Sequence, residues 1–252
     1  MDKTDFLTIY GTFENLEVVK QTLPSIVEET KRSNSKLIVH DSSVNNREEK
    51  WKYLQDLNKD NDFFLILSSN MSMAHSRNMC LQLGQELYAP EYVCMLEDDH
   101  AFSVGGIDIL KDVMSKYYGK VSTNGLMYGL FTGCSNHFTP FRMKVEDDLF
   151  CPSLDNEPMK VGKANSCFRC APTNHWNNVL KGYDTDEYLI STFQTSNLNL
   201  RNYHKGYTSM LIINDVFYSI DNTTGRGTSD IEKKRLWDDK FCRSDKRSKS
   251  RG

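Results

Sequence analysis

The chain has 252 residues, of which 38% are hydrophobic and 26% charged, and its formal net charge at pH 7 is -3. This is the composition of a globular protein with a sizeable core, and the nearly balanced charge gives no reason to expect nucleic acid as a partner. No apolar run reaches the roughly 18 residues of a membrane span, and seven scattered cysteines without a secretory leader favour reduced thiols and a cytoplasmic protein.

Strand-like apolar segments alternate with segments of helical spacing through the first hundred residues. The apolar residues Leu16, Val19 and Leu23, for example, recur at the spacing of one helical face. Such alternation predicts βαβ units and an α/β fold with a Rossmann-like, mainly parallel sheet flanked by helices. Strands are predicted over 6–11, 36–43, 62–69 and 91–96, and helices over 16–27, 48–57 and 77–88.

The pattern becomes mixed after Gly105. A helix is predicted over 107–118 and a strand over 125–131, followed by loop-rich sequence to about Ala171, which favours antiparallel pieces. We expect a single domain over residues 1–242, in which 1–103 form the parallel half and 104–242 a smaller antiparallel, loop-rich half. Residues 243–252 hold five Arg or Lys and no apolar side chain, which is typical of a disordered tail. Such a basic tail suits either peripheral contact with an anionic membrane or a solvated terminus.

Three consecutive acids, Glu97, Asp98 and Asp99, follow the fourth predicted strand. Three adjacent carboxylates inside a core strand would each lose their hydration, so we expect them at the strand end with positive charge nearby. Two carboxylates separated by one residue can hold a hard divalent cation and leave positions open for phosphate oxygens. The alternative is a solvated acidic loop.

The order of these features resembles the family 2 glycosyltransferases of the GT-A fold. That resemblance rests on "IYGTFEN" (9–15), "IVHDSS" (38–43), "NMSMAHSRNMCLQLG" (70–84) and "MLEDDH" (95–100). Further on, "VLKGYDTDEY" (179–188), "LNLRNYHKGY" (198–207) and "DNTTGRGTSD" (221–230) are similar to later family segments. Gly11 stands where the family usually has proline, and Phe13 where it usually has tyrosine.

The resemblance implies transfer of a sugar from a UDP- or GDP-sugar to a hydroxyl of a glycan, polysaccharide or glycolipid, with inversion. It makes 1–103 the nucleotide-binding half and 104–242 the acceptor-binding half. A Mn²⁺ or Mg²⁺ ion is expected at Glu97 and Asp99, as a Lewis acid for the leaving diphosphate. The other residues expected to bind the nucleotide sugar are Thr12, Phe13, Glu14, Asp41, Arg77 and Asp98.

One departure from the family concerns the catalytic base. The acidic pair that precedes the family's Arg-containing helix falls, by alignment on Arg201, near Gln194 and Thr195, which cannot accept a proton at neutral pH. The nearest carboxylates are Asp184, Asp186 and Glu187, of which we select Asp186. These three acids also suit the first turn of a helix, where negative charge is favourable.

Each binding residue has a structural alternative. Asp41 suits a cap of the segment that follows it, Arg77 a surface ion pair, Phe13 a core position and His100 a solvated loop. Cys134 with His137 and Cys167 with Cys170 have spacings compatible with a structural zinc site, although buried free thiols explain the cysteines as well.

Two other function classes fit parts of the sequence. A nucleotidyltransferase would also use an α/β sheet and a metal-binding acid pair, but the loop "GTFEN" is acidic and has one glycine, which disfavours that class. A module that binds a sugar nucleotide or a glycan without turnover needs no base, so Gln194 and Thr195 are compatible with it.

Overall fold

We describe the fold from a computed structural model of the chain. It describes residues 3–45, 47–68, 71–122, 125–133, 150–152, 168–185, 194–212 and 217–219. The predicted tail, 243–252, lies outside these residues.

The centre of the structure is an eight-stranded sheet in the order β3-β2-β1-β4-β8-β6-β9-β7. The pairs β3-β2, β2-β1 and β1-β4 are parallel, β8 is antiparallel to both β4 and β6, and β6-β9 is parallel. All of these strands except β8 and the edge strand β7 therefore run the same way, which confirms the expected α/β architecture with a mainly parallel sheet. The strands are β1 (Phe6–Thr12), β2 (Lys36–Asp41), β3 (Phe64–Leu67), β4 (Tyr92–Glu97), β6 (Met127–Gly133), β7 (Phe150–Pro152), β8 (Phe168–Pro172) and β9 (Tyr207–Ile212).

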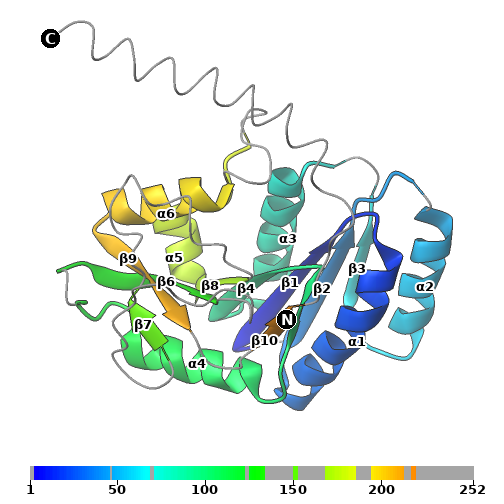
Figure 1. Cartoon of the computed structure of the whole chain (residues 1–252), viewed down its shortest axis with the longest axis horizontal. Helices are drawn as coiled ribbons and strands as arrows, with labels where there is room; N and C mark the ends of the chain where they lie inside the picture. The colour runs from blue at the N-terminus through cyan, green and yellow to red at the C-terminus, as the bar shows by residue number, and fades with distance from the viewer. Residues whose placement is uncertain are drawn as a thin grey trace, which may run out of the picture.

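Helices cover both faces of this sheet, as Figure 1 shows. Side chains of α1, α2 and α4 share one hydrophobic cluster with one face, and those of α3, η1 and α6 share a second cluster with the other. The helices are α1 (Leu16–Arg32), α2 (Arg47–Lys59), α3 (Met73–Tyr88), α4 (Gly106–Tyr117), α5 (Thr173–His175), the π-helical turn η1 (Trp176–Leu180) and α6 (Gln194–His204).

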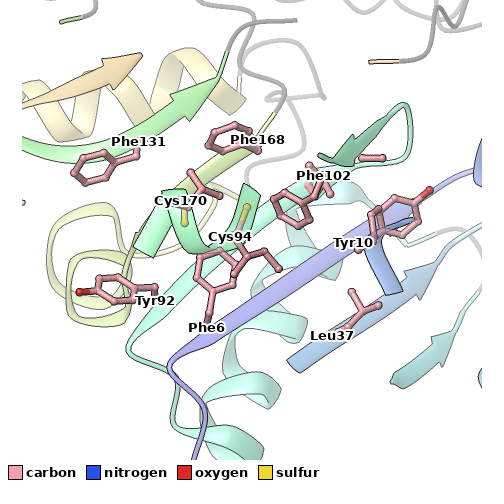
Figure 2. Close-up of a cluster of buried hydrophobic side chains, with 14 of the residues drawn as sticks. Phe6, Tyr10, Leu37, Tyr92, Cys94, Phe102, Phe131, Phe168 and Cys170 are labelled. Carbon is pink, nitrogen blue, oxygen red and sulfur yellow. The ribbon is translucent and has the colours of Figure 1, made fainter. Parts of the chain in front are cut away.

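Alternation along the strands builds the two clusters. In β1, Phe6 and Tyr10 face the α1 side, whereas Leu7 and Ile9 face the α3 side, and all four are at most 2% exposed. A strand buried on both faces reads as a continuous apolar run, which is why the sequence shows "FLTIY" rather than a polar alternation. Figure 2 shows the α1-side cluster, with Tyr10 and Phe6 from the same strand.

The antiparallel join between the two halves lies at β4 and β8. Cys94 is the register partner of Cys170, and both thiols are buried in the α1-side cluster (Figure 2). Burial raises the pKa of Cys170 well above its usual value, so this thiol stays protonated and serves as apolar filler. The predicted antiparallel strand content of the second half is thus present, although its β6-β9 pair is parallel.

The largest boundary difference concerns α3. We predicted a helix from Arg77, but α3 begins at Met73, with Ser72 as its N-cap accepting a hydrogen bond from the backbone N–H of His75. Arg77 therefore lies in the second turn rather than at the helix N-terminus, and the expectation of its terminal position was wrong.

A second, small sheet stands beside the acidic segment. Strand β5 (His100–Phe102) directly follows the predicted metal motif in the sequence, and it pairs antiparallel with β10 (Phe217–Ser219). A segment from late in the chain is thereby placed next to the strand that follows the acids. None of the described helices has the length and hydrophobicity to cross a bilayer.

Candidate active site

The carboxyl ends of β1, β2 and β4 meet at one edge of the sheet. Thr12 of β1 lies beside Asp41 of β2, and Gly11 lies beside Glu97 of β4. The order of the strands reverses between β1 and β4, because β2 and β3 continue on one side while β4 follows on the other. Ligands of open α/β sheets bind outside the strand ends at such a reversal. The candidate site is the set of side chains at and just beyond these strand ends.

Asp98 joins the acidic segment to the loop after β1. Its side chain is fully buried, and its carboxylate accepts hydrogen bonds from the backbone N–H of Phe13 (3.2 Å) and the hydroxyl of Thr12 (3.4 Å). Its carbonyl accepts from the hydroxyls of Thr22 (2.8 Å) and Tyr10 (3.1 Å). Burial raises the pKa of Tyr10 and the charge of Asp98 raises it further, so the phenol remains a donor. The structure thus brings Thr12, Phe13 and Asp98 together as one hydrogen-bonded unit.

The carboxylate of Asp41 has partners on both oxygens. Lys50 Nζ lies 2.7 Å away, the Ser43 hydroxyl donates at 2.8 Å and the Trp51 indole N–H at 2.7 Å. Asp41 is fully buried and Lys50 is 1% exposed, and Lys50 also donates to the hydroxyl of Thr12 (2.8 Å). Any contact between Asp41 and a nucleobase would therefore add to these bonds or replace one of them. The role of Asp41 in reading the base stays a prediction.

Lys50 and Trp51 are members of this cluster that we did not single out from the sequence. For Lys50 the sequence did contain an indication, because Lys50 and Leu54 are four residues apart and form the buried face of α2. A lysine on the apolar side of an amphipathic helix needs a buried anion, and Asp41 at the end of the neighbouring strand is that anion.

The loop after β1 is held in an unusual conformation at Glu14. Its φ of 59° lies in the left-handed region, which is rare for a residue with a side chain. Its backbone N–H donates to the Ser43 hydroxyl (2.7 Å), and its carboxylate accepts from the backbone N–H groups of Val44 (2.9 Å) and Asn45 (3.0 Å). The preceding residue, Phe13, is 47% exposed, so the alternative that Phe13 is a core residue was wrong, and its ring is accessible for stacking.

Glu97 lies between two buried arginines. Arg77 of α3 approaches its carboxylate at 3.1 Å and Arg169 of β8 at 3.6 Å, and each arginine is 3% exposed. The alternative of a surface ion pair for Arg77 was therefore wrong. Its Nη1 has no hydrogen-bond partner within the described part of the chain. The positive charge that we expected near the acids is thus present, and Arg169, in the otherwise apolar "FRCAP", is a contributor that we missed.

Of the three acids Glu97, Asp98 and Asp99, Asp99 has the most exposed side chain. The side chain of Asp99 is 24% exposed and that of Glu97 is 19% exposed. Oδ1 of Asp99 lies 2.5 Å from Nδ1 of His100, and His100 is buried in β5 rather than solvated. Mg²⁺ binds typically through one or two carboxylates together with substrate phosphates and water, and Asp99 fits that need. Glu97 fits it less well, because it already shares its carboxylate with two guanidinium groups. Among the described residues, no three His, Cys, Asp or Glu side chains form a metal site on their own.

The candidate catalytic bases are described only in part. Asp184 lies two residues after Gly182, whose carbonyl accepts a hydrogen bond from Arg201 of α6 (2.9 Å). Burial lowers the pKa of Arg201, while the negative charge of Asp184 acts in the opposite direction. Asp186 and Glu187 lie outside the described residues. Gln194 and Thr195 lie in the first turn of α6.

Of the four residues with spacings compatible with a zinc site, only Cys170 is among the described residues. Cys134, His137 and Cys167 lie outside them, and Cys170 faces Cys94 in the core. The alternative of a buried free thiol holds for Cys170.

Comparison with solved structures identifies similar folds. TarS from S. aureus (residues 1–349) in complex with UDP-GlcNAc superposes with a TM-score of 0.65 at 8% identity, covering 90% of this chain and 61% of that one. The same protein in complex with UDP gives a TM-score of 0.62 at 10% identity, covering 93% and 64%. The mannosyltransferase PcManGT from Pyrobaculum calidifontis, in complex with GDP-Man and Mn²⁺, gives 0.55 at 13% identity, covering 88% and 59%.

This chain therefore spans about three fifths of the length of these neighbours. Comparison of the sequence with protein-family models and with curated proteins finds no match. At these identities the structural likeness defines the fold, and the chain has the GT-A type of α/β fold that the sequence led us to expect.

Proposed function

We propose that the protein is a glycosyltransferase that moves a sugar from a nucleotide-diphosphate sugar to an acceptor hydroxyl. One observation carries the proposal. The Thr12–Phe13 loop, the Glu97–Asp99 acids and Arg77 lie together at the sheet edge where the strand order reverses between β1 and β4. Structural neighbours of the same fold hold UDP-GlcNAc and GDP-Man, which supports a UDP- or GDP-sugar as donor.

In this proposal the nucleoside lies against the loop after β1. The exposed ring of Phe13 stacks on the base, and Thr12 and Glu14 define the edge of the base site, since both are bonded to the segment that follows β2. Asp41 lies beneath this loop, where Lys50 ties it to Thr12. Asp98 holds the backbone of Phe13 and thereby links the base site to the acids.

The leaving diphosphate needs positive charge as its own negative charge develops. Arg77 supplies a fixed cation beside Glu97, inside the protein where electrostatic stabilisation is strongest. Asp99, with Glu97 as a second carboxylate, would hold a Mn²⁺ or Mg²⁺ ion, which as a Lewis acid stabilises the charge on the diphosphate. The Mn²⁺ of the mannosyltransferase neighbour supports a divalent ion in this chain.

For an inverting reaction, a carboxylate takes the proton of the acceptor hydroxyl while that oxygen attacks the anomeric carbon from the face opposite the diphosphate. We propose Asp186 for this role, with Asp184 and Glu187 as neighbouring candidates, and a glycan, polysaccharide or glycolipid as acceptor. The bond to the acceptor oxygen forms as the bond to the diphosphate breaks, and the electron pair leaves with the diphosphate.

A thermal-shift screen of UDP- and GDP-sugars, each with and without Mn²⁺, tests the proposal. We expect one donor to raise the melting temperature in a Mn²⁺-dependent manner, because binding to the folded state alone adds about 2.7 kcal/mol at a ligand concentration of 100 times Kd. Asp99→Asn should abolish the Mn²⁺-dependent part of the shift. Asp108→Asn, which alters an exposed acid of α4, is the matched control and should leave that part unchanged. An Asp99→Asn protein with the full wild-type shift would contradict the assigned role of Asp99.

A further inference from the structure

Tyr183 is buried where α3, β8 and η1 meet. Its side chain is 3% exposed and stacks on Trp176, with ring centroids 5.9 Å apart and an interplanar angle of 26°. It follows Lys181 and Gly182, which both have positive φ, so the chain turns sharply just before it. The turn and the stacking on Trp176 together fix the position of the Tyr183 ring.

The backbone of Tyr183 is held by one amide side chain. Asn78 of α3 accepts from the backbone N–H of Tyr183 (2.7 Å) and donates to its carbonyl (2.8 Å). The fit leaves no room for a larger residue at position 182, because a Cβ on Gly182 would lie 2.6 Å from Oδ1 of Asn78. Asn78 is the residue after Arg77, so the same turn of α3 places Arg77 at Glu97 and fixes Tyr183.

The side chain of Tyr183 contacts both arginines of the site. The guanidinium carbon of Arg77 lies 5.0 Å and that of Arg169 6.0 Å from the ring centroid, within the range of cation–π attraction. Arg169 also donates from Nη1 to the hydroxyl of Tyr183 (3.3 Å). One residue therefore restrains the two cations that lie on either side of Glu97.

We propose that Tyr183 is a positioning residue that fixes Arg77 and Arg169 for a diphosphate group and connects them to the segment carrying Asp184. The inference rests on the proposed function, because it assigns the diphosphate of the donor to these arginines. Its physical basis is preorganisation: an anion bound by groups that are already held in place has less side-chain entropy to overcome. The Asn78 clamp extends the connection from the cations to the loop on the acceptor side.

Inorganic pyrophosphate is the probe, and its affinity is measured by calorimetry with EDTA present so that the arginines act alone. The wild-type protein should bind it. Tyr183→Phe keeps the ring but loses the bond to Arg169, and affinity should fall roughly 3- to 10-fold. Tyr183→Leu also loses the cation–π contacts, and its affinity for pyrophosphate should fall by more than about tenfold. Asn78→Ala should lower the affinity for pyrophosphate as much as Tyr183→Leu does, because the backbone of Tyr183 then loses both of its hydrogen bonds to Asn78.

A double-mutant cycle separates positioning from general destabilisation. If the hydroxyl of Tyr183 acts through Arg169, adding Tyr183→Phe to Arg169→Met should change the affinity for pyrophosphate by less than about twofold. Tyr118→Phe is the matched control, because it removes a tyrosine hydroxyl bonded to His175 instead. All measurements are made well below the melting temperature of each variant, so that folded protein is compared with folded protein.

The possible results lead to different conclusions. Failure of the wild-type protein to bind pyrophosphate, an undiminished affinity in Tyr183→Leu, or an additive effect in the cycle would each overturn the assignment of Tyr183. If the graded loss and the non-additive cycle are observed but no nucleotide sugar is bound or turned over, the positioning role stands and glycosyl transfer is the part that fails.

Discussion

The ion pair of Asp41 and Lys50 is the most consequential side-chain contact that we identify beneath the candidate base site. Both charges are almost fully buried, and Lys50 directs its three protons to Asp41, Thr12 and Ser43. A buried charge pair is tolerated when its remaining protons and lone pairs are satisfied, and that condition is met here. The pair therefore fixes the loop after β1 against the end of β2.

Removing the positive partner should be costly. Lys50→Met leaves Asp41 as an uncompensated buried carboxylate, and we expect the free energy of unfolding to fall by about 3–5 kcal/mol. Urea unfolding followed by tryptophan fluorescence measures this, and Trp51 reports on the site directly because its indole N–H binds Asp41. Adding Asp41→Asn to Lys50→Met should restore part of the loss, since the unpaired charge is then removed.

Lys52→Met provides the comparison on the same helix, because Lys52 is exposed. It should change the free energy of unfolding by no more than about 0.5 kcal/mol. Equal stability of Lys50→Met and Lys52→Met would show that the ion pair does not hold this loop.

The position of the acids at a strand end could be predicted from the sequence, but most of their contacts could not. The placement of Glu97 at a strand end followed from the cost of burying adjacent acids, and its positive neighbour was expected, but nothing local indicated that Arg169 would be that neighbour as well as Arg77. Arg169 comes from a strand more than seventy residues later, and only the antiparallel β4-β8 pair brings it near. Such a long-range contact leaves no periodic signal in the chain.

At the level of elements, the βαβ half was predictable and the helix start before Arg77 was not. The strand β4 was expected over 91–96 and is Tyr92–Glu97, because an uninterrupted apolar run defines a doubly buried strand. The beginning of α3 was placed four residues late, since the polar loop "NMSMAHS" hides its cap, Ser72. In the second half, β8 and β9 are short strands whose partners are distant, so their order in the sheet could not be read from spacing.

The packing of α5 against the sheet contains a buried histidine that should make stability depend on pH. His175 is fully buried against Gly129 of β6, and its Nε2 lies 2.8 Å from Oδ1 of Asn202 in α6. Burial lowers the pKa of His175 to about 4 from an ordinary value of 6.5. The unfolded chain therefore binds a proton between these pH values that the folded chain does not, and the free energy of unfolding should fall as pH falls from 6.5 toward 4.

Between pH 6.5 and pH 4, the lowered pKa of His175 should reduce the free energy of unfolding by about 2–3 kcal/mol. Urea unfolding at pH 6.5, 5.5 and 4.5 measures it, with His175→Gln expected to show a shallower decline than the wild type. His204→Gln, at an exposed histidine of α6, should retain the wild-type decline. Parallel curves for His175→Gln and the wild type would contradict the role of His175.

At the scale of the whole molecule, one sheet joins the two halves of the chain. β4 contributes Glu97 to the site and pairs with β1 on one side and β8 on the other. Arg169 on β8 and Tyr183 after η1 reach Glu97 and Arg77 from the second half, so the site is assembled from both halves rather than from the βαβ half alone. The division into a nucleotide-binding and an acceptor-binding half stays a prediction.

A structure of the protein bound to Mn²⁺ and to the UDP- or GDP-sugar selected by the thermal-shift screen is the most direct test of glycosyl transfer at this sheet edge. We predict the diphosphate within hydrogen-bond distance of Arg77, the cation between the diphosphate and Asp99, and the base against Phe13. A donor bound at another surface, with Asp99 and Arg77 unchanged from their contacts described above, would contradict the account.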